Sequence, residues 1–417
     1  MASIKMGTEQ LVPHLFRTEF RKITAMLCRN FGLEYLGDSE DIASECFLAA
    51  LETWPYKGVP ANPSAWLFRV AKNKAINRLR REKSRREGEE GERRREEGEG
   101  GEVEVYMELP RVQDDELRML FAVCHPALSA ESQVALALRV CCGFGIDEIA
   151  GALLAGKEAV NKRLYRAKEK IRTEGIQLEL PEGAELINRL QNVLITIYLL
   201  FTEGYYSETN NELIREELCF EAMRLAYSLT ELKETNQPEV QALMALFCFH
   251  ASRFPARKSA TGNWVLYSEQ DTSLWNRELI TKGAQYLHRA SVGQYVSRYH
   301  LEAAIAYWHT HQVDSPEKWE SILELYDQLM KQYPSQVAAL NRVYAVYKVH
   351  GSELAIESAE KLRLIKSPYY FMLLAELYWE QDNLHARISL NKALELAKTD
   401  ADRNFIHKRL LSFNYEE

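Results

Sequence analysis

The stretch "ESQVALALRVCCGFGIDEIAGALLAGKEAVNKRLYRAKEKIR", residues 131–172, decides the fold of this chain. Its apolar residues recur at intervals of three and four, which predicts α-helix. The glycine pair in "GFG" (143–145) and a turn at about 154–156 separate three such helices. The last helix has an apolar face made of Val160, Leu164, Ala167 and Ile171. Its opposite face is mostly cationic and consists of Ala159, Lys162, Arg163, Arg166 and Lys170. This pattern predicts a helix-turn-helix whose last helix enters a DNA major groove, with a plain three-helix core as the alternative.

A second basic helix is predicted at "WLFRVAKNKAINRLRR", residues 66–81. At 100° per residue, its small and apolar side chains form one stripe, and a polar stripe lies roughly opposite. The polar stripe consists of Arg69, Asn73, Asn77 and Arg80. Asparagine both donates and accepts hydrogen bonds and can therefore read a base edge, whereas arginine pairs with phosphate or guanine. The stripe therefore indicates nucleic acid, and a solvated basic face or a membrane-surface helix remain alternatives.

An acidic helix precedes it at "GDSEDIASECFLAALETW", residues 37–54. Asp38 is expected to cap its N-terminus. Asp41, Glu45 and Glu52 line a face that points away from the apolar residues. DNA would repel this face, so we expect it to contact a basic protein surface, unless it is simply a solvated face.

Charge is sorted into blocks along a chain whose formal net charge is −8. Residues 66–86 have nine basic side chains and one acidic, whereas residues 87–104 have nine glutamates and three arginines. Such blocks usually mark contact surfaces or tails. Residues 82–104 contain Val103 as their one apolar side chain and predict a flexible linker, because they cannot bury enough surface to fold.

The seven cysteines are odd in number and scattered, which predicts reduced thiols and no disulfide framework. The N-terminus has no apolar signal region, and no run of about 18 apolar residues occurs. We therefore expect a cytoplasmic protein.

Helical periodicity covers almost the whole chain of 417 residues, so the predicted fold class is all-α. A repeat occurs near the C-terminus, where four positions return after 31 residues: Leu340, Val343, Tyr347 and Ala355 as Phe371, Leu374, Tyr378 and Ala386. This spacing is typical of a solenoid of helix pairs similar to tetratricopeptide repeats (TPR), and two ordinary helical hairpins are the alternative. The predicted divisions are 8–86, a linker at 87–111, 112–175, 182–300 and 301–417.

The order of these elements resembles that of bacterial sigma factors of the extracytoplasmic-function (ECF) group, within the sigma-70 family. An acidic helix, a proline-bearing loop, a basic helix, a linker and a basic helix-turn-helix follow one another as they do there. Residues 8–86 would be region 2, and residues 112–175 region 4. Three further segments resemble the subgroup with a C-terminal TPR-like helical extension: "LFTEGYYSE" (200–208), "LCFEAMRLA" (218–226) and "DTSLWNRELI" (271–280).

The resemblance implies a factor that directs core RNA polymerase to promoters and assists DNA melting. Asp41 and Glu45 would contact the clamp helices of the polymerase β′ subunit, and the β flap would be a second contact. The loop at 53–65 and the basic helix would engage the −10 element, through Arg69, Asn73, Asn77, Arg80 and Arg81. The −35 element would contact Ala159, Lys162, Arg163, Arg166 and Lys170. The extension would bind a regulatory protein or ligand.

The sequence favours no enzyme, cofactor or metal site. The glycines of residues 98–101 do not open a helix and precede no GK[ST], so a phosphate loop is not expected. Cys124, His125, Cys141 and Cys142 lack the spacing of a zinc site. A hydrolase or transferase would need a convergent polar cluster in residues 182–300, which the sequence does not suggest. The remaining alternative is a helix-turn-helix regulator with a helical-repeat scaffold that acts without polymerase.

Overall fold

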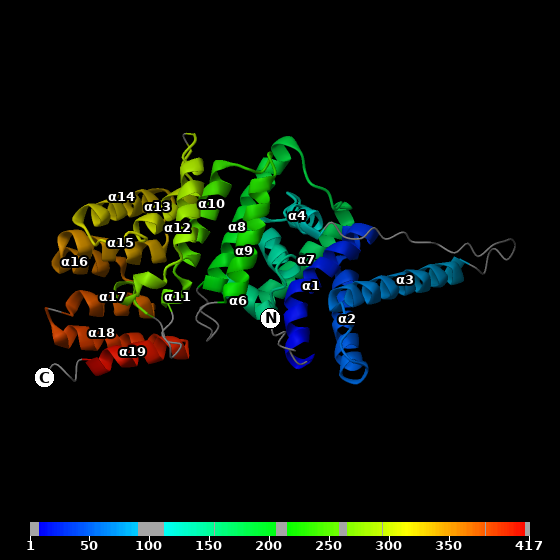
Figure 1. Cartoon of the computed structure of the whole chain (residues 1–417), viewed down its shortest axis with the longest axis horizontal. Helices are drawn as coiled ribbons and strands as arrows, with labels where there is room; N and C mark the ends of the chain where they lie inside the picture. Colours follow the sequence, from blue (N-terminus) through cyan, green and yellow to red (C-terminus); the bar gives the residue numbers. More distant parts are fainter. Residues whose placement is uncertain are drawn as a thin grey trace. The chain divides into compact units, whose positions relative to one another are not determined.

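The protein is described by a computed structural model that covers residues 8–90, 112–153, 155–205, 215–257, 265–293, 295–379 and 381–412. These residues form α-helices and short 3-10 helices and contain no strand (Figure 1), which confirms the predicted all-α class. The chain forms two compact units, Met1–Thr196 and Ile197–Glu417. The division falls inside one continuous helix, α8 (Gly183–Tyr205), and not between residues 175 and 182 as the sequence pattern suggested.

The first unit begins with a three-helix bundle and continues with a four-helix group. Its elements are α1 (Thr8–Phe31), η1 (Leu33–Tyr35), α2 (Leu36–Lys57), α3 (Pro63–Glu90), α4 (Val112–Val123), α5 (Ala130–Val140), α6 (Ile146–Ala152) and α7 (Lys157–Glu174). The apolar cluster of the bundle has its buried members on α1, α2 and α3. On α3 these are Leu67, Ala71 and Ala75, as the periodicity predicted.

Three local expectations for this bundle need correction. Asp38 does not cap α2, because a 3-10 turn leads the chain into the helix at Leu36 and leaves Asp38 inside its first turn. The loop expected at 53–65 is shorter, because α2 continues through Pro55 to Lys57 and ends at Gly58, whose φ of 81° favours glycine. Helix α3 continues to Glu90, into the segment expected as linker, since its last residues are mostly good helix formers. Residues 91–111 lie outside the described residues.

The three helices predicted from residues 131–172 are present as α5, α6 and α7. Gly145 and Gly156 stand at the N-caps of α6 and α7. The Glu148 carboxylate accepts a hydrogen bond from the Gly145 N–H at 2.7 Å, which fixes the start of α6. The predicted apolar face of α7 is buried, with Val160, Leu164, Ala167 and Ile171 all at 6% exposure or less.

All seven cysteines are free and buried, in agreement with the expected reduced thiols. Burial raises the pKa of Cys28, Cys46, Cys124 and Cys248 to about 12. A thiol with so high a pKa is almost entirely protonated at neutral pH.

The second unit consists of the end of α8 and the helices that follow. These are α9 (Glu216–Glu231), α10 (Pro238–Ala251), α11 (Phe254–Arg257), η2 (Tyr267–Glu269), η3 (Thr272–Leu274), α12 (Arg277–Ala290), α13 (Arg298–Trp308), α14 (Pro316–Gln332), α15 (Gln336–His350), α16 (Ser352–Leu362), α17 (Pro368–Tyr378), α18 (Asn383–Leu396) and α19 (Asp400–Ser412). Helix α10 packs against both α12 and α13, so the segments on either side of residue 300 form one unit.

The predicted repeat corresponds to two consecutive helical hairpins, α15–α16 and α17–α18. Ala355 and Ala386, the small residues of the pattern, are both completely buried at equivalent places in α16 and α18. The larger members contribute to one apolar cluster, in which Val343, Phe371 and Leu374 are buried and Leu340, Tyr347 and Tyr378 are partly buried. The periodicity therefore reflects equivalent packing of the two hairpins.

A glycine sets the close contact between α10 and α12. A Cβ atom built on Gly283 would lie 2.6 Å from Cε1 of Phe249, whose ring is 1% exposed. Such a distance is too short for any real carbon pair, so an added methyl group would push the helices or the ring aside.

We therefore expect Gly283→Ala to destabilise the second unit. Overpacking should cost about 1–3 kcal/mol of unfolding free energy, more than the gain of up to about 1 kcal/mol in helix propensity. Thermal unfolding followed by circular dichroism measures the effect. Gly37→Ala is the matched control, because a Cβ on Gly37, which lies in α2, meets no atom within 4 Å. An unchanged melting temperature for Gly283→Ala would contradict the close packing.

Candidate nucleic-acid interface

Helix α3 presents the predicted polar stripe to solvent. Arg69, Asn73 and Asn77 are exposed, while Leu67 and Ala71 on the opposite side are completely buried. The helix can lie close to its neighbours because alanines line its buried side. The side chains of Arg80 and Arg81 lie outside the described residues. The described part of the stripe thus offers a guanidinium and two amides along one exposed face.

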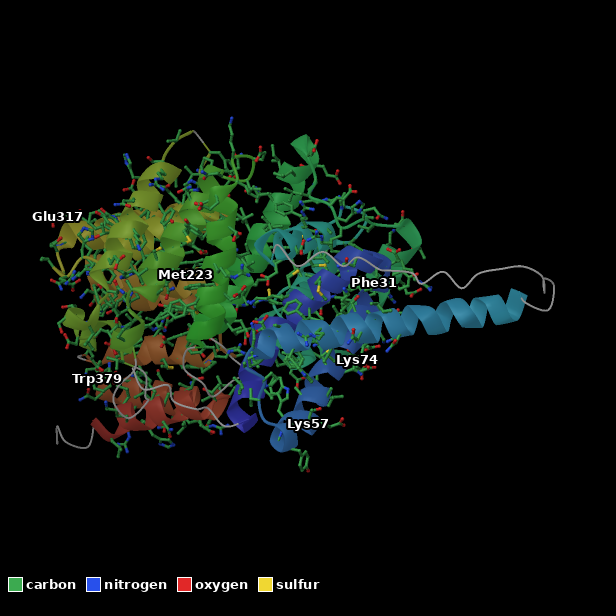
Figure 2. All side chains as sticks on the ribbon, turned by 45° about the vertical axis from the view of Figure 1, so that its right-hand side comes forward. Phe31, Lys57, Lys74, Met223, Glu317 and Trp379 are labelled. Atoms are coloured by element: carbon green, nitrogen blue, oxygen red, sulfur yellow. The ribbon has the colours of Figure 1, made fainter. Side chains whose placement is uncertain are left out.

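Two other cations of α3 are engaged with α2. Lys74 Nζ lies 2.8 Å from Glu45 Oε2, and Arg78 is paired with Asp38. Lys74, on α3, and Lys57, at the end of α2, are labelled in Figure 2. These pairs are partly exposed, so each contributes modestly to stability. They fix the register of α3 on α2 and thereby the direction in which the polar stripe points.

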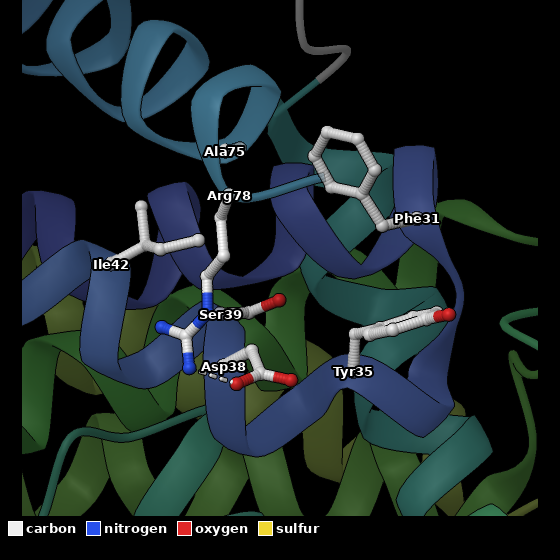
Figure 3. Close-up of a pocket in the computed structure, with 7 residues that line it drawn as sticks. All are labelled: Phe31, Tyr35, Asp38, Ser39, Ile42, Ala75 and Arg78. Atoms are coloured by element: carbon white, nitrogen blue, oxygen red, sulfur yellow. Dashed lines mark hydrogen bonds and ion pairs between the residues drawn. The ribbon is translucent and has the colours of Figure 1, made fainter. Parts of the chain in front are cut away.

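A small cavity lies behind this helix pair and is walled by Phe31, Tyr35, Asp38, Ser39, Ile42, Ala75 and Arg78 (Figure 3). The space that it offers is about 20 Å³, which suits a water molecule and is far too small for a nucleobase. Base capture by this cavity is therefore excluded in this conformation.

The last turn of α2, next to the short loop before α3, has an exposed aromatic side chain that the sequence analysis included in the segment 53–65 but did not single out. Tyr56 is 89% exposed next to the loop, whereas Trp54 is 2% exposed and packs edge-on against Trp66 at 5.4 Å. The Asn62 side chain accepts a hydrogen bond from the Ala65 N–H at 3.0 Å and so caps the start of α3. An exposed ring beside a rigid pair of tryptophans can stack on an unpaired base. The sequence "WPYKG" could have indicated that Tyr56 is exposed, because an aromatic residue close to both proline and glycine has few neighbours to bury it.

The face of α7 that the sequence predicts to contact DNA is exposed. Ala159, Lys162, Arg166 and Lys170 are exposed, and Arg163 is half-buried. Arg163 lies 2.8 Å from Glu131, and Lys170 lies 3.8 Å from Glu174. Both carboxylates are more than half exposed, so a phosphate can replace them at little cost. Tyr165, 69% exposed on the same helix, was not singled out from the sequence.

The acidic face of α2 also contains apolar residues. Asp41, Glu45 and Glu52 are exposed, as predicted. Leu48 and Leu51 lie between them and are 58% and 48% exposed. Spacings of three and four residues place Asp41, Glu45, Leu48 and Glu52 in one stripe. This mixture of acids and leucines is typical of a protein-binding surface. The sequence did not identify the leucines as exposed, because they continue the apolar run of the helix.

Other classes of site receive no support from the described residues. Among them, no group of three or more His, Cys, Asp and Glu side chains is placed to hold a metal ion. No helix in the described part of the chain is both long and apolar enough to cross a bilayer.

Comparisons with known proteins find similarity in two regions of the chain and to one whole protein. Residues 17–85 match the family model of sigma-70 region 2, and residues 189–291 match a family of unknown function, DUF6596. The chain is 36% identical over 381 residues to "Uncharacterized protein R00370" of Rhizobium meliloti (strain 1021), and the alignment covers 89% of each chain. No solved structure matches. The region 2 match contains α2, the loop that follows it and α3 as far as residue 85. Residues 17–85 therefore contain a sigma-70 region 2 domain, residues 189–291 contain a DUF6596 domain, and the chain belongs to the same family as the Rhizobium protein R00370.

Proposed function

We propose that this protein is an ECF-type sigma factor that brings core RNA polymerase to specific promoters and helps to open the DNA. The observation that supports it best is the exposed face of α3, with Arg69, Asn73 and Asn77, inside the segment that matches region 2. In this role the protein works in the cytoplasm, where core polymerase is found.

Helix α3 and the adjoining loop would hold the −10 element. The arginines attract the phosphate backbone, and the two asparagines can bond to base edges. Tyr56 offers a stacking surface for a base that leaves the duplex, which offsets part of the cost of unstacking. Arg80 and Arg81 would extend the cationic surface toward the end of the helix.

Residues 112–175 would act as region 4 at the −35 element. Helix α7 would lie in the major groove with Ala159 and four cations facing the DNA: Lys162, Arg163, Arg166 and Lys170. The stripe on α2 would bind the clamp helices of the polymerase β′ subunit, and region 4 would contact the β flap. Leu48 and Leu51 would supply the apolar contact there, and Asp41 and Glu45 would supply electrostatic complementarity.

The C-terminal unit would regulate this activity. Its paired helices, including the TPR-like hairpins α15–α16 and α17–α18, would bind a regulatory protein or ligand. Residues 182–300 and 301–417 would together form this extension, and its N-terminal helix α8 starts within the first unit.

Replacing Asn73 with alanine should reduce transcription from promoters with the preferred −10 element more than it reduces nonspecific DNA binding. The loss of a base contact of this kind costs about 1–3 kcal/mol of the free energy that distinguishes the preferred base from a wrong one. In vitro transcription with purified core polymerase, compared with binding to random duplex, measures both quantities. Asn188→Ala, at an exposed position of α8, is the control. Equal losses in both assays would refute a base-reading role.

Replacing Arg166 with alanine should weaken binding to −35 DNA. It should also reduce the magnitude of the negative slope of log K against log[salt] by about 1. The reason is that one phosphate contact, and the counterion released with it, would be lost. Fluorescence anisotropy over a range of salt concentrations gives the slope. Lys282→Ala, an exposed cation of α12, should leave it unchanged. A slope that stays the same in Arg166→Ala would place this residue outside the DNA interface.

Charge reversal at Asp41 and Glu45 together should abolish stable association with core polymerase, because like charges would then face each other. Losing the Glu45–Lys74 pair accounts for little of this effect, since both side chains are partly exposed. Co-purification of the full chain with core polymerase is the assay, and Glu278→Lys in α12 is the control. Association that survives the double reversal, or its absence in the wild-type protein, would favour a helix-turn-helix regulator that acts without polymerase.

A further inference from the structure

Arg253 is a partly buried arginine of the second unit, and no carboxylate among the described residues pairs with it. It lies in the turn between α10 and α11. Its Nε and Nη2 atoms donate to the amide oxygen of Gln270 at 3.1 and 3.0 Å. The guanidinium carbon lies 4.7 Å from the centre of the Tyr267 ring and 5.5 Å from that of the Trp275 ring. One neutral oxygen and two aromatic rings thus take the place of a counter-ion.

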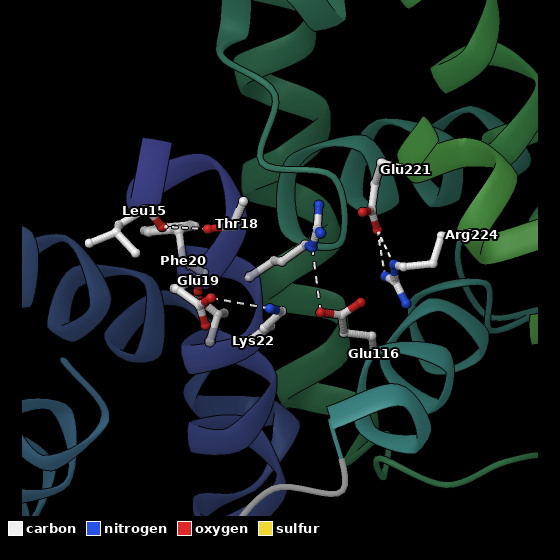
Figure 4. Close-up of polar contacts among 10 residues, drawn as sticks. Leu15, Thr18, Glu19, Phe20, Lys22, Glu116, Glu221 and Arg224 are labelled. Carbon is white, nitrogen blue, oxygen red and sulfur yellow. Dashed lines mark hydrogen bonds and ion pairs between the residues drawn. The ribbon is translucent and has the colours of Figure 1, made fainter. Parts of the chain in front are cut away.

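Two other partly buried arginines of this unit do have a carboxylate partner. Arg224 Nε donates to Glu221 Oε1 at 2.9 Å (Figure 4). Arg409 Nη2 donates to Glu376 Oε2 at 2.7 Å, and its guanidinium also lies over an aromatic ring, that of Trp379, at 4.8 Å. Burial of a cation without a carboxylate is more costly than burial of an ion pair, because nothing offsets the lost hydration. The unpaired guanidinium therefore weakens the free fold.

A second cation lies against the same tyrosine. Lys318 of α14 is 2% exposed, and its Nζ donates to the Tyr267 hydroxyl and to the His311 carbonyl, each at 3.0 Å. Asp314 lies 3.7 Å from this ammonium group but only 2.8 Å from that of Lys348. Two lysines thus share one half-exposed carboxylate, and the arginine has none. The cluster therefore has an excess of positive charge.

The neighbouring rings are affected by this excess. Burial, followed by the charge of Arg253, lowers the pKa of His250 and of His309 to about 3, so both imidazoles are neutral at pH 7. Two buried nitrogens beside Tyr267, Trp275 Nε1 and His309 Nδ1, have no hydrogen-bond partner in the described part of the chain. The indole nitrogen can only donate, and the imidazole nitrogen donates in one tautomer. The cluster thus lacks acceptors as well as negative charge.

An oxyanion head group supplies both. The planar guanidinium fork suits two oxygens of one carboxylate or phosphate, and Arg253 Nη1 has no acceptor among the described residues. Because this side chain is only partly buried, an oxyanion can reach it from solvent. Lys318 adds positive potential, since its Nζ lies 5.3 Å from the centre of the Tyr267 ring that the guanidinium also contacts.

We propose that a small organic oxyanion, a carboxylate or a phosphate monoester, binds at an anion site made of Arg253, Tyr267, Trp275, His309 and Lys318. The aromatic rings offer apolar contact to the organic part of the ligand. The site gives a ligand class to the C-terminal unit. Binding itself needs no polymerase, whereas its effect on transcription rests on the proposed function.

A bound oxyanion would connect two segments of the second unit. Arg253, Tyr267 and Trp275 belong to the DUF6596 match, in the segment from the end of α10 to the end of η3. His309 is the C-cap of α13, and Lys318 lies in α14. The ligand would offset the repulsion between the cations of these segments. It should therefore stabilise the folded chain against unfolding.

The binding test uses the full chain without polymerase. Benzoate and phenyl phosphate are the probes, because they share a ring and differ in head group, and benzyl alcohol is the neutral control. At constant ionic strength, at least one probe should raise the melting temperature with concentration and give a saturable signal in calorimetric titration. A response to benzoate alone assigns a carboxylate, and a response to phenyl phosphate alone assigns a phosphate. No response to either probe, or an equal response to benzyl alcohol, would overturn the anion site.

Arg253→Met separates a binding role from a structural one. The variant should bind the effective probe at least about tenfold more weakly, because a charge-assisted hydrogen bond is lost. Without the probe it should melt at the wild-type temperature or above, since an unpaired charge has been removed from a partly buried place. Arg409→Met is the matched control, which also loses an arginine over a ring but should keep the wild-type affinity.

Two results with these variants would refute the role of Arg253. One is an affinity that stays unchanged in Arg253→Met or falls equally in Arg409→Met. The other is a fall in melting temperature larger than that of Arg409→Met, which would show that the arginine braces the fold. If Arg253→Met does not fold, Arg253→Gln is measured and has to show the same loss of affinity.

In vitro transcription with core polymerase tests the regulatory step separately. The effective probe should change the transcription rate of the wild-type protein and leave that of Arg253→Met unchanged. Transcription that is equal with and without the probe would overturn the regulatory effect. A complete absence of transcription would count against the proposed function instead and leave the binding result intact.

Discussion

The close packing of α3 on α2 is the interaction on which the other features of the first unit depend. Leu67, Ala71 and Ala75 form a narrow apolar stripe that needs only a small part of the circumference of α3. The rest of α3 is left for polar groups, and the outer face of α2 is left for acids and leucines. Two ion pairs, to Asp38 and to Glu45, then set the rotation and register of the pair. One helix pair thereby presents two chemically different surfaces, and neither surface is needed for the core.

Much of this arrangement can be predicted from sequence because helical periodicity decides which side chains face inward. The buried and exposed faces of α7, and those of α3 as far as Arg78, were predicted correctly, and the repeat spacing located two equivalent hairpins. The features that the sequence did not predict have one of two causes. They depend on packing neighbours that are distant in sequence, or on the backbone conformation with which the chain enters a helix. Asp38 looks like a cap, but the 3-10 turn before α2 moves the start of the helix. Leu48 and Leu51 look like core residues, but no other helix among the described residues covers them.

The ion pairs between the two halves of the first unit show the same limit more strongly. Nothing in the sequence distinguishes Glu40, Asp115 and Glu116, which are buried and paired with Lys168, Arg29 and Arg21, from the exposed Asp41. Their burial follows from which helix packs on which, and pattern reasoning does not supply that. The division within α8 is similar, because an uninterrupted amphipathic pattern gives no sign that the two ends of one helix belong to different compact units.

The deep burial of the seven thiols has a chemical consequence. Peroxides and other oxidants attack the thiolate, and at neutral pH a group whose pKa is near 12 offers almost none of that species. Cys28 and Cys46 are in addition completely inaccessible to solvent. The folded chain should therefore be a poor direct sensor of oxidative stress. If its activity responds to such stress in the cell, these buried thiols are poor candidates for the group that the oxidant attacks first.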